Sequence, residues 1–157
     1  MKRVNIYIGI NPASTRKSKK RYGFVMECVI SGEPQTVDQF GEVEDTYNGT
    51  VLKVINAALR RMTRSAEIHL FVENTFILNM IEKNLDLWAG NGFKNSKGNP
   101  LENQEEWRML WSHSIKHLIA TEPGRHIFSE WIREILANDV KFNKKIEEQE
   151  KRGKRNV

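Results

Sequence analysis

The side chains that most directly suggest a binding function are basic ones, clustered near the N-terminus. Five of the six residues from 16 to 21 are basic. They are Arg16, Lys17, Lys19, Lys20 and Arg21. Clustered Lys and Arg attract polyanions such as nucleic acid, so we predict that these five side chains contact one, and the alternative is a loop whose charges face only water. The single Cys28 cannot form an internal disulfide, and no Cys/His spacing fits a zinc site.

The net charge is concentrated at the C-terminal end. The 157 residues carry 25 Lys and Arg against 20 Asp and Glu, a formal charge of +5. Residues 141–157 hold seven basic and three acidic residues, so residues 1–140 together carry a charge of only +1. Because residues from about 144 onward are almost devoid of apolar side chains, we predict a folded domain over 1–140 and a basic, disordered tail over 141–157.

Composition and length exclude several classes of protein. The chain is 39% hydrophobic and 29% charged, as in an ordinary globular domain, and its length suits one such domain. No apolar run approaches the roughly 18 residues that a membrane helix needs, and residues 1–5 lack the apolar region of a secretion signal. We expect a cytoplasmic monomer that does not enter a membrane.

The hydropathy pattern predicts strands first and then mostly helices. Apolar residues alternate over 4–10 and 36–44, and residues 22–30 have the composition of a strand. The later pattern predicts a helix over 50–62, a strand over 67–72, a short helix around 76–80, a helix over 103–114, a strand over 115–120 and a last helix beginning near Pro123.

This order of elements, βββαβααβα, predicts an α/β fold with a mixed five-stranded sheet flanked by helices. The basic run at 16–21 falls in the predicted connection between the first two strands. Asn5, Tyr7 and Gly9 should share one face of the first strand. Gly41 is a candidate β-bulge in the third strand.

A segment in the second half of the chain resembles the type 1 ribonuclease H family. The family pattern is a Trp, then Gly-Trp-Lys, then Pro-Val-x-Asn, then Asp-Leu-Trp. This chain has Trp88, Gly92-Phe93-Lys94, Pro100-Leu101-x-Asn103 and Glu106-Trp107 at nearly the same spacing. The order of elements also resembles that family over roughly residues 3–137. The resemblance implies a ribonuclease H-like fold and a nucleic-acid partner, either an RNA–DNA hybrid or a duplex.

The resemblance also implies where a catalytic site would lie. The family hydrolyses the RNA strand of a hybrid with two Mg²⁺ ions held by four carboxylates. The matching positions here are Gly9, Val51, Glu73 and Arg133. Glu73 alone can bind a metal, so we expect no Mg²⁺ or Mn²⁺ cofactor and a catalytically degenerate protein. Where the family has an active-site histidine, this chain has Pro123.

Further residues match family positions that contact the substrate. Asn48 and Asn74 match residues beside the hybrid backbone, with a helix-entry turn and a helix N-cap as the alternative roles. Trp88, Lys94 and Lys97 correspond to a protrusion that grips the DNA strand, and the alternative for Trp88 is a packing role. Through the resemblance, these five residues join the predicted nucleic-acid-binding set.

Two other functions stay open at this point. An active ribonuclease would recruit other carboxylates beside Glu73, such as Glu44, Asp45 or Glu130, and would then require Mg²⁺ or Mn²⁺. A protein-interaction module would use the same fold as a scaffold, because a fold does not determine a function. Cleavage of a hybrid and gel shifts over a salt series separate these alternatives.

Overall fold

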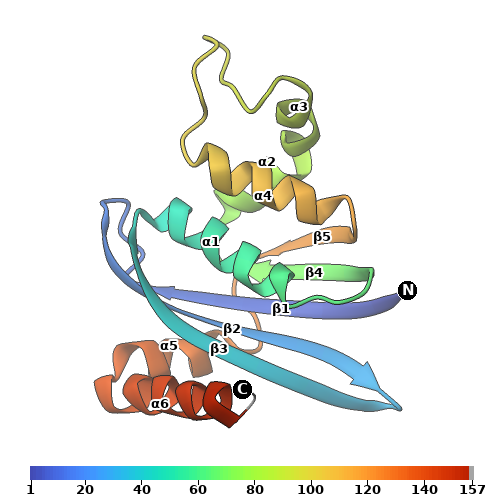
Figure 1. The fold of residues 1–157 in the computed structure, drawn as a ribbon. Helices are drawn as coiled ribbons and strands as arrows, with labels where there is room; N and C mark the ends of the chain where they lie inside the picture. The colour runs from blue at the N-terminus through green and yellow to red at the C-terminus, as the bar shows by residue number, and fades with distance from the viewer. Residues whose placement is uncertain (156–157) are drawn as a thin grey trace.

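The computed structural model describes residues 1–155, and these form a five-stranded mixed sheet with helices on both faces (Figure 1). The elements are β1 (Lys2–Asn11), β2 (Ser18–Ile30), β3 (Glu33–Asp45), α1 (Tyr47–Arg60), β4 (Ala66–Val72), α2 (Thr75–Lys83), α3 (Leu85–Gly90), α4 (Gln104–Ser114), β5 (Leu118–Pro123), α5 (Ser129–Ala137) and α6 (Asp139–Arg155). The predicted fold class is confirmed. None of the helices in residues 1–155 is long and apolar enough to cross a bilayer.

The central strand is β1, in the sheet order β3-β2-β1-β4-β5. It pairs antiparallel with β2 and parallel with β4, and β4 pairs parallel with β5. The alternation predicted for β1 is confirmed, because Val4, Ile6 and Ile8 pack in the core on the α1 face while Tyr7 packs on the opposite face. Helices α1 to α4 lie on one side of the sheet and α5 with α6 on the other (Figure 1).

The helices between β4 and β5 differ from the prediction. Residues 85–90 form a further helix, α3, that the pattern did not predict, so three helices instead of two lie between β4 and β5 in the described chain. The fifth strand runs over 118–123 rather than 115–120, and Pro123 ends it instead of starting the last helix. The reason is that residues 115–117 make the turn after α4, where His117 Nδ1 accepts a hydrogen bond from the Ala66 backbone N–H at 3.1 Å.

The second strand begins earlier than predicted, at Ser18, because its antiparallel register with β3 runs without interruption from Ser18 opposite Asp45 to Ile30 opposite Glu33. Three of the five basic residues, Lys19, Lys20 and Arg21, therefore lie on a strand and not in a loop. The same register pairs Gly41 with Tyr22, so the candidate bulge at Gly41 is wrong. A Cβ on Gly41 would lie 2.4 Å from the Tyr22 hydroxyl oxygen, which explains a glycine in this strand.

The prediction of a disordered tail over 141–157 is wrong for the described part of that segment, and the domain boundary at 140 is wrong with it. Helix α6 covers the edge strand β3, and Phe142 is buried in the core on that face. Gln149 Nε2 donates to the Phe40 carbonyl at 2.8 Å, and its Oε1 accepts from the Phe40 N–H at 2.5 Å. Residues 156–157 lie outside the described residues.

Candidate functional site

A cleft at the carboxyl ends of β1 and β4 brings three of the four sequence-predicted carboxylate positions together. The strands stop pairing after Tyr7, which is opposite Phe71, so they separate beyond that point. The resulting cleft has a volume of about 410 Å³ and is lined by Gly9, Glu73 and Arg133, among others. The second position does not join them, because Val51, on α1, is fully buried in the core between that helix and the sheet.

The position of the first carboxylate, Gly9, lies directly against α5. A Cβ on Gly9 would be 2.5 Å from Cγ2 of Ile132, and a Cβ on the neighbouring Gly23 would be 3.2 Å from the same methyl group. The two glycines on adjacent strands therefore form a slot that the fully buried Ile132 fills. No carboxylate side chain can project from β1 at this point unless α5 moves.

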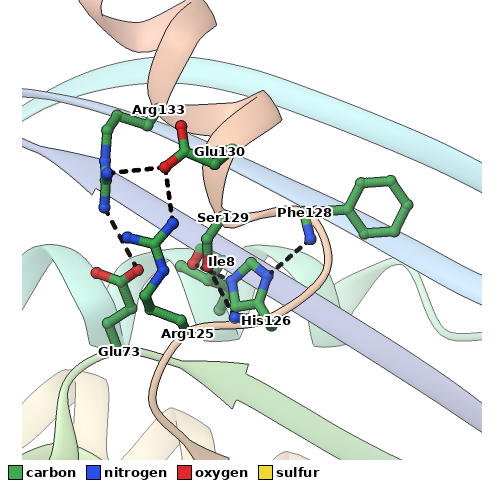
Figure 2. A network of polar contacts seen from close by, with 8 residues as sticks. All are labelled: Ile8, Glu73, Arg125, His126, Phe128, Ser129, Glu130 and Arg133. Atoms are coloured by element: carbon green, nitrogen blue, oxygen red, sulfur yellow. Dashed lines mark hydrogen bonds and ion pairs between the residues drawn. The ribbon is translucent and has the colours of Figure 1, made fainter.

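Glu73 and Arg133, at the third and fourth of the four positions, carry opposite charges and face each other (Figure 2). Arg133 Nη2 lies 3.8 Å from Glu73 Oε1, and its Nη1 lies 3.2 Å from Glu130 Oε1. The same Glu130 oxygen accepts from Arg125 Nη2 at 2.7 Å. The hydrogen bond from Arg125, together with the charges of both arginines, lowers the pKa of the Glu130 carboxyl below its usual value. Glu73 is close enough to α1 to raise the pKa of the Tyr47 hydroxyl, in addition to the larger effect of burial.

The two carboxylates at the cleft, Glu73 and Glu130, do not fit a pair of Mg²⁺ ions. Magnesium requires several carboxylate or water oxygens in octahedral array, whereas Glu73 and Glu130 each face a guanidinium group. Within residues 1–155, no group of three or more His, Cys, Asp or Glu side chains has the arrangement of a metal site. The substitute carboxylates Glu44 and Asp45 do not line the cleft. Asp45 forms an ion pair with Lys53 at 2.7 Å.

His126, in the loop before α5, connects this loop to the end of β1. Its Nδ1 accepts from the Phe128 N–H at 3.2 Å, so the ring proton is on Nε2 and is donated to the Ile8 carbonyl at 3.0 Å. The ring packs against Tyr7 at a centroid distance of 5.2 Å. Burial lowers the pKa of His126, which favours the neutral ring that these two bonds require. The arrangement gives His126 a structural role.

Asn48 and Asn74 lie together where α1 and α2 begin. Asn74 Oδ1 accepts from the Ile77 N–H at 2.9 Å, so the predicted alternative role of Asn74 as a helix N-cap is confirmed. Its Nδ2 donates to Asn48 Oδ1 at 2.8 Å. The α1 helix begins nearby with Thr46 as its own N-cap. Contact of the asparagine pair with nucleic acid stays a prediction.

The basic run divides into buried and exposed cations. Lys20 is fully buried, and its ammonium donates to three oxygen atoms of the protein at 2.6–2.8 Å. The prediction that Lys20 contacts a polyanion is therefore wrong. Arg21 bonds the Leu136 carbonyl at 3.1 Å and pairs with Asp139 at 2.8 Å, so it holds α5 and α6 against β2 instead of facing solvent. Arg16, Lys17 and Lys19 are exposed.

The predicted protrusion is an exposed loop between α3 and α4. Lys94 and Lys97 are exposed on this loop, and their predicted contact with nucleic acid stays a prediction. The Trp88 ring packs edge-on against Trp107 at a centroid distance of 4.9 Å, which confirms the alternative packing role of Trp88. Phe93 is buried beneath the Arg108 guanidinium, 5.5 Å from the ring centre.

Sequence reasoning missed Arg125 as a neighbour of the cleft and missed the connection that Glu130 makes between the two arginines. One signal was available, because Glu130 and Arg133 are three residues apart on one helix and such side chains are neighbours on its surface. Arg125 carried no comparable signal, since it precedes the helix and reaches Glu130 only through the shape of the loop.

Comparisons with known proteins find similarity to ribonucleases H over about half of the chain. No family model matches the chain. Ribonuclease H of Mycolicibacterium gilvum is 32% identical over 78 residues, which are 49% of this chain and 52% of that relative. The chain spans about half the length of the curated relatives it matches first.

Two solved structures extend the likeness to most of the fold. LC9-RNase H1, a type 1 ribonuclease H with the type 2 active-site motif, has a TM-score of 0.69 at 18% identity and covers 87% of this chain and 71% of its own. A foamy viral protease-reverse transcriptase in complex with an RNA/DNA hybrid has a TM-score of 0.60 at 16% identity, covering 85% and 18%.

Proposed function

This chain is a ribonuclease H-like protein, and we propose that it binds nucleic acid, an RNA–DNA hybrid or a duplex, without two-metal hydrolysis. The observation that carries the proposal is the ion pair between Arg133 and Glu73 in the cleft. A guanidinium at a carboxylate position repels divalent cations and competes with them for the one remaining carboxylate. The slot filled by Ile132 against Gly9 adds to this, because it leaves no room for a second carboxylate.

Exposed cations on two loops support a nucleic-acid partner. The loop that carries Arg16 and Lys17 also contributes Ala13 to the wall of the cleft. Lys94 and Lys97 stand on the loop after α3, on the α1 side of the sheet. Lysines and arginines that neutralise phosphates make binding strongly dependent on salt. The names of the relatives and the hybrid bound by the foamy viral enzyme support the same class of partner.

The first experiment measures binding and cleavage on the same material. The full chain is incubated with a labelled hybrid, a DNA duplex and a single strand, with Mg²⁺, Mn²⁺ or a chelator. We expect a gel shift with hybrid or duplex that weakens as salt rises, and no cleavage with either metal. The double variant Lys94→Gln/Lys97→Gln should weaken binding and reduce the salt slope by about two.

A matched control removes the same charge elsewhere. Lys144→Gln/Lys151→Gln alters two exposed lysines of α6 and should change affinity much less. Metal-dependent cleavage that Glu73→Gln abolishes would overturn the proposal in favour of an active nuclease with substitute carboxylates. Absence of any shift at low salt would instead favour a protein-interaction module on the same fold.

A further inference from the structure

Two guanidinium groups are held side by side next to the cleft by one carboxylate oxygen. Glu130 Oε1 lies 3.2 Å from Arg133 Nη1 and 2.7 Å from Arg125 Nη2 (Figure 2). Like charges at such short range repel each other, and the shared carboxylate offsets that repulsion. The loop bearing Arg125 is itself fixed by the His126 bond to the Ile8 carbonyl. The two cations are therefore positioned before any ligand arrives.

Both guanidinium groups retain hydrogen-bond donors that these contacts do not use. Each carries N–H groups on three nitrogen atoms, and Glu130 takes one nitrogen from each. Arg133 Nη2 lies 3.8 Å from Glu73, which is beyond hydrogen-bond length. The planar fork of a guanidinium matches two oxygens of a phosphate group. Adjacent forks with spare donors can hold one tetrahedral phosphate between them.

The cleft beside the arginines has the size and the walls for such a group. Its volume of about 410 Å³ lies within the range of roughly 300–1,000 Å³ that small-ligand sites occupy. Ile8, Val72 and Leu136 provide apolar walls around Arg133. Glu73 is the counter-ion that an incoming phosphate must replace, and its separation of 3.8 Å from Arg133 Nη2, without a hydrogen bond, makes it easy to replace.

From this geometry we propose that Arg125 and Arg133 bind a phosphodiester of the nucleic-acid backbone directly, so that the cleft takes an anion without any divalent cation. The inference rests on the proposed function, since it names how that same cleft contacts its partner. In this arrangement the arginine pair supplies the positive charge that bound Mg²⁺ supplies where a ribonuclease H site holds four carboxylates.

The test measures hybrid affinity by fluorescence anisotropy at constant ionic strength, in a chelator and in Mg²⁺. We expect the two dissociation constants to agree within about twofold, given that no metal takes part. Arg133→Gln should weaken binding about tenfold or more, as loss of a charged, forked hydrogen bond does. Arg133→Lys should recover only part of that affinity, because it keeps the charge but loses the fork.

Two further variants make the result specific. Arg152→Gln is the matched control, since Arg152 is about as exposed as Arg133, at 52% against 51%, and lies on α6 beside Asp38. It should change affinity less than about twofold. Glu73→Gln should tighten binding, because it removes the competing carboxylate. If Glu73 instead held a metal, Glu73→Gln would weaken binding and the effect would require Mg²⁺.

The outcomes separate the inference from the proposed function. If the hybrid binds but Arg133→Gln behaves like Arg152→Gln, the inference is wrong and nucleic-acid binding stands. If affinity requires Mg²⁺, the inference is wrong as well. A titration with inorganic phosphate alone, followed by the NMR signals of the arginine Nε–H groups, gives the second arm. Shifts at Arg125 and Arg133 without any binding of hybrid would overturn both proposals for nucleic acid and assign the site to a free phosphate compound.

Discussion

Replacing Gly9 with alanine tests whether β1 and α5 are fitted to each other at the cleft. The new Cβ would lie 2.5 Å from Ile132 Cγ2, whereas ordinary contacts begin at 3.4 Å, so the two atoms must separate by about 0.9 Å. Ile132 has little freedom to yield, because its β-branched side chain is stiff at χ1 and fully buried. The same methyl group also faces Gly23.

The expected cost follows from overpacking. Extra volume in a closely packed core destabilises a protein by about 1–3 kcal/mol, whereas a glycine-to-alanine change without strain stabilises it by about 0.4–1 kcal/mol. We therefore expect Gly9→Ala to lower the free energy of unfolding by about 1–3 kcal/mol. Each kcal/mol corresponds to a decrease in Tm of about 2–4 °C for a chain of this size.

Thermal and urea unfolding of Gly9→Ala provide the measurement. Gly90→Ala is the matched control, since a Cβ there meets nothing within 4 Å, and its stability should be unchanged or higher. Ile132→Ala alone should cost about 2–5 kcal/mol, but the double variant should cost less than the sum by about 1 kcal/mol or more. A Gly9→Ala protein as stable as the wild type, or strictly additive effects, would refute the close fit between β1 and α5.

Three further predictions concern the elements around the cleft. Phe142→Ala should cost roughly 3–5 kcal/mol in thermal unfolding, because the ring is buried between α6 and the sheet; a neutral result would mean that α6 is not part of the folded core. Burial lowers the folded-state pKa of His126, so its contribution to stability is complete above about pH 6.5 and is lost as the pH falls through the folded value. The free energy of unfolding, measured over a pH series, should show this loss, and the loss should be smaller in His126→Gln. A part should remain in that variant, because the pKa values of His113 and His117 are also lowered in the folded state. Burial alone would raise the pKa of the Asp45 carboxyl, but Lys53 and the Thr46 N–H outweigh it and hold that pKa below its usual value. The ion pair between Asp45 and Lys53 therefore stabilises the fold above about pH 3.9, and this stabilisation is lost at lower pH. Lys53→Met should be less stable than the wild type at neutral pH, and the difference should vanish in acid.

Some elements of the fold were predictable from local pattern. The alternation in β1 survives folding because a strand always places successive side chains on opposite faces. Helix α6 was not predictable in this way, since its stretch offers few apolar residues to indicate a buried face. Its stability comes from contacts with the distant strand β3, where Gln149 satisfies both backbone groups of Phe40.

The basic run shows the same limit at the level of single charges. Sequence alone identifies five cations between residues 16 and 21, and an isolated charge is expected to face water. Lys20 is buried nonetheless, because the fold places the Asp45 carbonyl, 25 residues away, within 2.8 Å of its ammonium. A charge can be buried when several oxygens replace its water, and only the folded chain shows where those oxygens are.

For the candidate site, the sequence by itself determined which chemical groups stand at the four family positions, because residue identity does not depend on folding. The side chains of Gly9, Val51 and Arg133 carry no carboxylate oxygen that could bind Mg²⁺. Only the tertiary structure decided which side chains surround these positions. The docking of α5 on β1 fills the space beside Gly9 with Ile132 and places Arg133 between Glu73 and Glu130. Gly9 and Ile132 are more than a hundred positions apart in the sequence, and Glu73 and Arg133 are sixty apart, so packing and not local pattern brings them together.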